Sequence, residues 1–259
     1  MDLVVEPTGE IFGTYSSTTG ASGRYLVYGY CSPDNPTNEQ GQPVALSITW
    51  RPFDSQTEND SWHWVSTYCG QLLPITNTDE PGSDNDDRSS VLSVINSLVA
   101  TTRYNGAALG DYIDKLAFHK QDDVAQFQPD DIEEMFHSHS RVENPINGTW
   151  KDTVNDLQLT LSVVNEQNGL IYAELTQNNQ TLTLKGFTDT LSLPYPKRQS
   201  ITLSGIRKDS DSTPVSLSGY LDQQNEQLIL TYWSAYGTPE AEAYLQTNAC
   251  STLFDRIQK

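Results

Sequence analysis

The stretches Gly13-Thr14-Tyr15-Ser16-Ser17 and Gly148-Thr149-Trp150 open two parts of the chain that share one pattern of strands and turns. The first part runs to about Phe127 and the second to Phe254. A repeat of nearly half the chain indicates tandem domains rather than a solenoid of short units. The two parts share a backbone pattern but differ in the residues that would face the interior, and this difference bears on function.

The repeat predicts three segments. We expect a barrel at 1–128, a short helix and linker at 129–145, and a second barrel at 146–259. Within the middle segment, Asp130–Phe136 has acidic residues in its first turn and apolar residues after them, which is typical of a short helix.

Short segments of alternating apolar and polar residues dominate both halves, with turn-rich loops between them. In the first half the expected strands are Ile11–Ser17, Arg24–Gly29, Val44–Trp50, Trp62–Leu72, Val91–Thr101 and Tyr112–His119. In the second half they are Gln158–Val164, Leu170–Leu175, Thr181–Gly186, Ser200–Ile206, Pro214–Leu221, Gln227–Trp233 and Tyr244–Phe254. A meander of such strands closes into an up-and-down barrel or leaves exposed edges. The predicted fold class is all-β, with two tandem antiparallel barrels.

The chain is strongly acidic, with 34 Asp and Glu against 15 Lys and Arg in 259 residues and a net charge of −19. Phosphate binding requires clustered basic residues, so we exclude nucleic acid and anionic membranes as partners. No run of the sequence is long and apolar enough to cross a bilayer. Met1 is followed at once by Asp2, without the pattern of a signal peptide, so we expect a cytoplasmic protein or one whose leader was trimmed.

Two groups of residues raise the question of a metal. His137 and His139 lie two apart beside an acidic helix, and acidic residues crowd the loop 79–87. Neither group has the spacing of a zinc site or an EF-hand, so we interpret both as solvated and expect no metal and no cofactor. No catalytic triad or phosphate-binding glycine loop can be assembled, so we expect no enzymatic activity.

The three cysteines leave two possibilities open. An odd number leaves at least one thiol free if any disulfide forms. Cys31 and Cys69 lie in the same half and could pair in an oxidising compartment, whereas Cys250 lies in the other half. Sequence spacing does not show whether two Cα atoms are close enough for a disulfide.

Several fragments resemble the avidin/streptavidin family. In the first half they are Gly13–Ser17, Ala45–Trp50 and Cys69-Gly70-Gln71, in that order. In the second half they are Gly148–Trp150, Ser218-Gly219, Thr231–Ser234 and Thr238–Tyr244. Their order and spacing extend the resemblance over most of the chain. The resemblance implies two eight-stranded up-and-down barrels, each with one ligand mouth, and a secreted or periplasmic location.

The resemblance starts late in the first half. Nothing before Met1-Asp2-Leu3 matches the first strand of the family. Seven strands alone would leave a barrel open. We therefore expect upstream residues, or else a neighbouring segment, to supply the missing strand.

Strand alternation places two sets of side chains on single faces: Tyr15 with Ser17, and Trp62 with Trp64, Ser66 and Tyr68. If these faces point inward, the first barrel has aromatic walls with hydroxyls among them. Such an interior suits a compact, partly apolar ligand with a polar head. The alternative is an ordinary core, with each hydroxyl bonded to the backbone.

The family's ligand is biotin, whose ureido group meets Tyr, Ser, Asn and Asp side chains between tryptophan walls. The resemblance implies the following ligand-binding residues: Tyr15 and Ser17 as donors, Trp50 as a wall, Ser66 and Tyr68 as further contacts, and Asp122 or Asp123 as the acid. Leu98 falls where another Trp wall is expected, and the first-strand Asn and Ser are missing. Each unmet buried polar group costs about 1–3 kcal/mol, so we expect weaker binding than the best of the family.

The second half departs further from the family's ligand set. At the corresponding positions stand Asp152, Asp156, Leu175, Ile206, Val215 and Thr252, and only Trp233 persists as a wall. An unpaired carboxylate facing a ligand carbonyl would repel it. We expect this barrel to bind no biotin and to be structural, although a more apolar ligand is left open.

Two tyrosines point to packing between barrels. Tyr112 and Tyr244 fall where the family has a Trp that caps the pocket of a neighbouring barrel. This implies an internal pseudo-dimer or a homo-oligomer. Two hypotheses of function follow: a non-catalytic binder of biotin or a biotin-like ligand in the first barrel, or an interaction and assembly module that keeps the barrel without a ligand.

Overall fold

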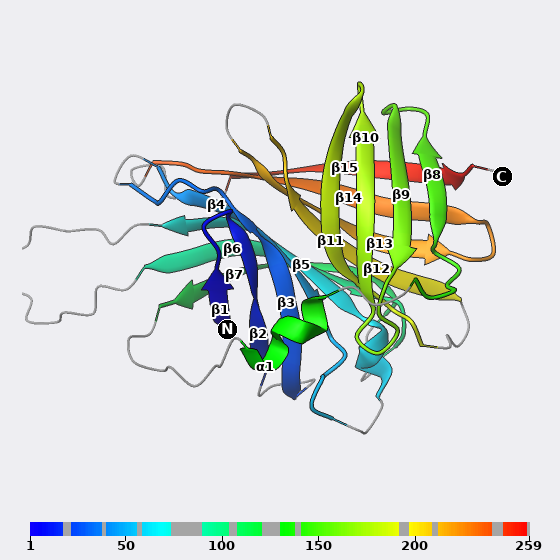
Figure 1. Cartoon of the computed structure of the whole chain (residues 1–259), viewed down its shortest axis with the longest axis horizontal. Helices are drawn as coiled ribbons and strands as arrows, with labels where there is room; N and C mark the ends of the chain where they lie inside the picture. The colour runs from blue at the N-terminus through cyan, green and yellow to red at the C-terminus, as the bar shows by residue number, and fades with distance from the viewer. Residues whose placement is uncertain are drawn as a thin grey trace, which may run out of the picture.

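The fold is all-β, with one sheet from each half of the chain (Figure 1). The computed structural model describes residues 1–17, 22–37, 40–55, 59–73, 90–103, 108–120, 130–137, 141–191, 197–208, 212–239 and 246–257. None of the helices within these ranges is long and apolar enough to span a membrane.

The first half forms a seven-stranded antiparallel sheet whose strand order follows the chain. Its strands are β1 (Asp2–Val5), β2 (Glu10–Ser17), β3 (Gly23–Cys31), β4 (Gln42–Thr49), β5 (Val65–Leu73), β6 (Val91–Ala100) and β7 (Gly110–His119). β1 and β7 each pair with one neighbour, so the sheet is open and the barrel expected for this half is not formed. In a meander of seven antiparallel strands the first and last run parallel to each other. An antiparallel ladder therefore cannot join β7 to β1.

The second half forms a closed barrel, as expected. Its strands are β8 (Gly148–Asp152), β9 (Leu157–Val163), β10 (Leu170–Gln177), β11 (Gln180–Thr188), β12 (Arg198–Ile206), β13 (Pro214–Asp222), β14 (Gln227–Tyr236) and β15 (Gln246–Arg256). With eight strands the first and last are antiparallel. β15 pairs with β8 through Asp255 opposite Lys151 and Arg256 opposite Trp150, which closes the ring.

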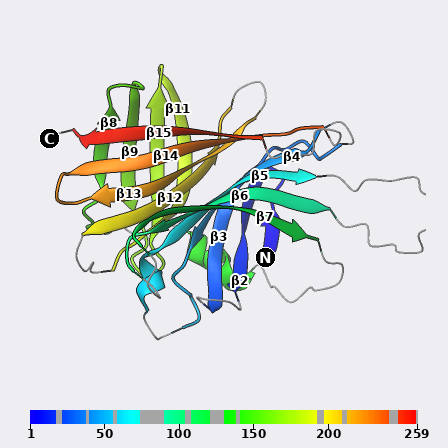
Figure 2. The same cartoon turned by 180° about the vertical axis from the view of Figure 1, so that it is seen from behind.

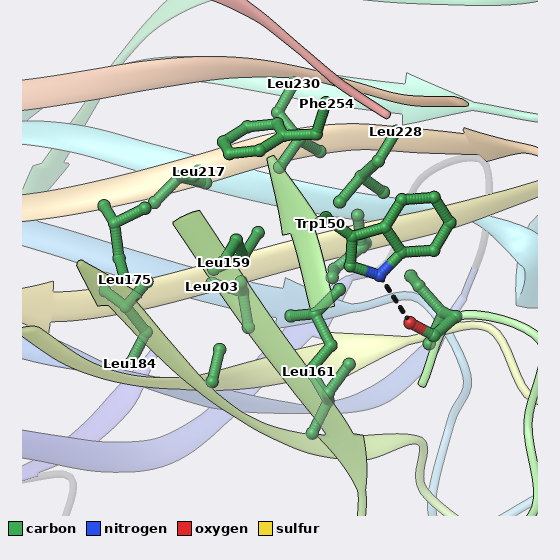
Figure 3. Close-up of a cluster of buried hydrophobic side chains, with 14 of the residues drawn as sticks. Trp150, Leu159, Leu161, Leu175, Leu184, Leu203, Leu217, Leu228, Leu230 and Phe254 are labelled. Atoms are coloured by element: carbon green, nitrogen blue, oxygen red, sulfur yellow. Dashed lines mark hydrogen bonds between the residues drawn. The ribbon is translucent and has the colours of Figure 1, made fainter. Parts of the chain in front are cut away.

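Leucine side chains fill the barrel interior (Figure 3). Leu159, Leu203 and Leu217 are fully buried, as is Phe254. Trp150 is also fully buried, and its indole N–H donates to the backbone oxygen of Ile146 at 2.9 Å. Large apolar residues on alternate positions of every strand produce this filled core.

Trp62 and Trp64 lie outside the strand that was expected to contain them. The 3-10 turn η1 (Asp60–His63) precedes β5, and Trp64 follows the turn. The Trp64 indole N–H donates to the backbone oxygen and to Oγ1 of Thr102, both at 3.0 Å. The expected common face with the inward residues of β5 is wrong for Trp62, because a helical turn does not keep the two-residue alternation of a strand.

The sheet and the barrel pack face to face, with β3–β6 lying against β12–β14 (Figure 2). Small hydroxyl side chains line this contact. Ser47 Oγ lies 2.7 Å from Ser204 Oγ, and Thr67 Oγ1 lies 3.0 Å from Thr202 Oγ1. These four buried hydroxyls satisfy one another, and their small size lets the two sheets approach closely.

A short helical segment fills a second part of the contact. α1 (Asp130–Glu133) and η2 (Glu134–Phe136) occupy the place where a short helix was expected. Ile132 and Phe136 are buried in a cluster that includes Tyr28 of the sheet and Phe187 of the barrel. The segment that connects the two halves in sequence thus also packs between them.

The disulfide left open by the sequence does not form. Cys31 and Cys69 are both free and buried. Cys31 belongs to the core cluster on the sheet face away from the barrel, whereas Cys69 packs against Trp233 of the barrel. The two thiols therefore lie on opposite faces of the sheet.

Candidate ligand-binding site

The face of the seven-stranded sheet that points away from the barrel carries a mixed aromatic and aliphatic cluster, which we call the inner face. Its buried members are Ile11, Tyr25, Val27, Cys31, Val44, Leu46, Ile48, Tyr68 and Val94, and Tyr15, Trp50, Leu92, Leu116 and Phe118 pack around them. Alternation along each strand places these side chains together, opposite the hydroxyls that meet the barrel.

Four of the predicted site residues meet on the inner face. The Tyr15 ring lies edge-on to Trp50 at 5.8 Å and to Tyr68 at 6.2 Å between ring centroids. The Trp50 indole N–H donates to Ser66 Oγ at 2.8 Å, and Ser66 is fully buried. β2, β5 and the residue after β4 thus contribute to one cluster of rings and hydroxyls.

Tyr68 lies deepest in this group. Burial raises the pKa of its phenol far above the usual range, and the nearby Tyr15, which hydrogen-bonds to it, adds to the effect. Phe118 of β7 stacks on Tyr68 with ring centroids 5.8 Å apart and reaches Tyr15 at 6.5 Å. The Tyr68 phenol therefore stays neutral and can act as a hydrogen-bond donor.

The other predicted residues are less central or cannot be placed. Ser17 is half-buried at the end of β2, two residues after Tyr15 and so on the same face. Leu98, at the position expected for a Trp wall, pairs in register with Ser66. Asp122 and Asp123 lie outside the described residues.

Asn96 joins these residues in the candidate site, although the sequence did not single it out. It lies on β6 directly opposite Tyr68, so its side chain shares the inner face. Its Oδ1 is buried and has no hydrogen-bond partner in the described part of the chain. Buried acceptors are nearly always paired, so this oxygen marks a place where a ligand donor would fit. Leu92, Val94 and Leu98 lie on the same face of β6, so alternation places Asn96 there, but the sequence does not show that its Oδ1 lacks a partner.

In the barrel, Asp152 does not face a ligand. Its carboxylate accepts hydrogen bonds from the backbone N–H groups of Val154, Asn155 and Leu253 and from the Asn155 side chain. The expectation of an unpaired, repelling carboxylate is therefore wrong. An Asp at the end of a strand instead caps the turn that follows.

Trp233 is not a wall of the barrel interior either. Leu228 and Leu230 on the same strand belong to the interior core, so Trp233 points to the outside. It packs there against Ala45 of the sheet, and its indole N–H donates to Ser218 Oγ at 3.0 Å. The one wall that the resemblance implies for the second half thus belongs to the contact between sheet and barrel.

The remaining sequence candidates do not add to a site. Tyr112 is 41% exposed and donates to the backbone oxygen of Ala108 at 2.6 Å, while Tyr244 lies outside the described residues. His137 lies 3.8 Å from Glu133 on the surface. His139 and the acidic loop 79–87 fall outside the described ranges. Within those ranges no group of His, Cys, Asp and Glu could hold a metal ion.

Comparison with known proteins gives no family for this chain. No protein-family model matches the sequence, and no curated protein matches it significantly. The likeness to the avidin/streptavidin family therefore stays a prediction from the sequence.

Proposed function

We propose that the seven-stranded sheet is a non-catalytic binding module for biotin or a compact biotin-like ligand, held on the inner face. The observation that supports this is the convergence of Tyr15, Trp50, Ser66 and Tyr68 beside Asn96, whose buried Oδ1 has no partner among the described residues. The barrel is the structural partner, because leucine side chains fill its interior.

The chemistry of a cyclic urea suits this face. Such a group offers one carbonyl acceptor and two N–H donors beside an apolar ring. The Tyr15 hydroxyl can donate to the carbonyl, and Asn96 Oδ1 can accept from an N–H, while Trp50 and Tyr68 pack on the ring. An unpaired buried acceptor costs about 1–3 kcal/mol, and a ligand N–H would remove that cost.

Titration calorimetry with biotin tests the proposal. We expect one site per chain, with affinity reduced in Tyr15→Phe and Trp50→Ala. Tyr220→Phe, on the outer surface of the barrel beside Arg198, is the matched control and should bind like the wild type. Two sites per chain would contradict a purely structural barrel. No heat at high protein concentration would refute biotin as the ligand.

The open sheet favours a second candidate, the interaction and assembly module. Val5 on β1 is 56% exposed and Ile113 on β7 is 64% exposed, and among the described residues each of these strands pairs with one neighbour. Free strand edges are templates for pairing with another chain. Because β1 and β7 run parallel to each other, one added strand antiparallel to both would complete an eight-stranded ring.

Analytical ultracentrifugation distinguishes the assembly module from a monomeric ligand binder. The backbone N–H of Lys115 on β7 donates to Asp114 Oδ1 at 2.8 Å and so points away from β6. The N–H of Ala117, two residues further along the strand, points to the same free edge. If β7 mediates assembly, the chain is an oligomer and Ala117→Pro, which removes an outward N–H, shifts it to monomer. A wild-type chain that stays monomeric at all concentrations would rule out self-assembly.

A further inference from the structure

A hollow lies between the sheet and the barrel, apart from the inner face. It has a volume of about 570 Å³, and both halves of the chain line it. The sheet contributes residues around the start of β2 and the end of β3, and the barrel contributes the β10–β11 hairpin and the end of β12. We call it the inter-sheet cleft. Its size falls within the range of small-molecule sites, about 300–1,000 Å³.

We propose that the inter-sheet cleft binds a neutral saccharide. This proposal is independent of the ligand proposed for the inner face. The apolar part of the cleft comes from the end of the barrel core, where Leu175 is buried and Leu182 and Tyr232 are half-buried. Tyr30 contributes a second aromatic ring from the sheet. Aromatic and aliphatic surfaces of this kind pack against the C–H face of a sugar ring.

A fixed carboxylate lines the same cleft. Glu10 Oε1 accepts a hydrogen bond from the Tyr28 hydroxyl at 2.7 Å and lies 3.6 Å from Lys185 Nζ. The hydroxyls of Tyr28 and Tyr30 lie 2.9 Å apart, and Lys185 Nζ sits 4.4 Å above the Tyr28 ring. These contacts hold one carboxylate oxygen. The other, Oε2, has no protein partner in the described part of the chain and can accept from a sugar hydroxyl.

Amide side chains surround the rim. Gln177 and Gln180 flank the turn between β10 and β11 and line the cleft with Asn178. The turn residues Asn178 and Asn179 have φ values of 50° and 63°, as a tight two-residue hairpin requires. An amide both donates and accepts hydrogen bonds. A sugar hydroxyl does the same, so the rim and the ligand are chemically matched.

The charges of the lining favour a neutral ligand. An anion would meet Glu10 and a chain whose net charge is −19. A cation would meet Arg207 and Lys208, which also line the cleft. A neutral, hydroxyl-rich ring incurs neither repulsion.

Saturation-transfer NMR of the full chain with maltose, cellobiose, galactose and N-acetylglucosamine tests the site. We expect transfer to the ring protons of at least one sugar, and at least a tenfold loss of affinity in Thr181→Trp, which fills the cleft, and in Glu10→Gln. Gln224→Ala, in the exposed turn between β13 and β14, is the matched control. If Thr181→Trp lowers the melting temperature, Gln180→Ala takes its place. Biotin titration of the same variants should be unchanged.

Two results would overturn the proposal. One is the absence of transfer for every sugar of the panel at millimolar concentration. The other is transfer of equal strength in the wild type and in the cleft variants, because the sugar would then bind elsewhere. Neither result bears on the inner face, where biotin is the probe.

Discussion

Asp152 and Asp222 cap two turns of the barrel with the same pattern, Asp-x-x-Asn. In each turn one carboxylate oxygen accepts backbone N–H groups, and the other accepts the side-chain amide of Asn155 or Asn225. The surroundings differ, because Asp152 is 1% exposed whereas Asp222 is half-exposed. Comparing the two aspartates therefore measures how much burial adds to the stability that the same turn provides.

The hydrogen bonds of Asp152 allow an estimate of how much Asp152→Asn lowers the free energy of unfolding. An amide can accept only with one oxygen, so the bonds from Val154 and Asn155 N–H at 2.8 and 3.1 Å survive. The bonds to Oδ2, from the Asn155 side chain at 2.6 Å and from Leu253 N–H at 3.3 Å, are lost. Bonds to a charged group contribute about 1.5–3 kcal/mol each, so we expect a loss of about 3 kcal/mol. Asp222→Asn loses one bond that water can replace, and should cost about 1 kcal/mol.

The pH dependence gives an independent check. Burial opposes ionisation of Asp152, but the hydrogen bonds from Asn155, Val154 and Leu253 outweigh it and lower the pKa of the carboxyl. A group whose folded-state pKa is lowered stabilises the protein above its unfolded pKa, and this contribution is lost as pH falls through the folded value. Urea unfolding should therefore show a large difference between wild type and Asp152→Asn at pH 7 that shrinks below about pH 4. A difference that stays constant down to pH 2, or equal costs for both Asp variants, would refute the reasoning.

Three further predictions concern the inner face, the barrel core and the thiols. Asn96→Leu removes an unpaired buried acceptor, so the free energy of unfolding of the unliganded protein in urea should rise by about 1–3 kcal/mol. Biotin affinity should fall at least tenfold. A destabilised variant would mean that Asn96 Oδ1 has a hydrogen-bond partner. Leu217→Ala should cost about 3 kcal/mol in the same assay, because it opens a cavity in a filled core, and a cost below about 1 kcal/mol would mean that the core is loosely packed. Burial raises the pKa of Cys31 to about 11 and of Cys69 to about 12, whereas Cys250 is exposed, so a thiol reagent at pH 8 should label one cysteine per chain rapidly. Rapid labelling of a second cysteine would contradict the burial of the other two.

The strands were predictable because period-two alternation is a local property. The expected strand Val91–Thr101 is observed as Val91–Ala100, and Ile11–Ser17 is observed as Glu10–Ser17. The strand expected at Trp62–Leu72 is observed as Val65–Leu73, because the 3-10 turn Asp60–His63 occupies its expected first residues. Local pattern thus gave the strands but not every boundary.

The site was predictable in part, for a physical reason. Tyr15, Trp50, Ser66 and Tyr68 meet on one face, as alternation within strands and their order along the chain imply. Asn96 was missed because an unpaired acceptor is defined by what fails to reach it, and only three-dimensional contacts show that. A sequence reveals which groups are present but not which of them lack a partner.

Trp233 and Asp152 show the limit of carrying a site over by resemblance. A shift of one residue along a strand moves a side chain to the other face, so a fragment can match a family while its side chains point the opposite way. Trp233 points to the sheet rather than into the barrel. Fragment likeness therefore predicts strands better than it predicts the groups that face a ligand.

The contact between sheet and barrel is held at both ends by polar pairs. At one end His63 Nδ1 lies 2.7 Å from Asp189 Oδ2, and at the other Gln71 Nε2 donates to Thr238 Oγ1 at 2.6 Å. Buried hydrogen bonds of this kind specify one arrangement, because any sliding of the sheets leaves them unpaired. The inner face lies on the other side of the sheet and shares none of these groups. A ligand bound at the inner face, as proposed above, would therefore leave these contacts in place. The edge strands β1 and β7 lie outside the strands β3–β6 that face the barrel.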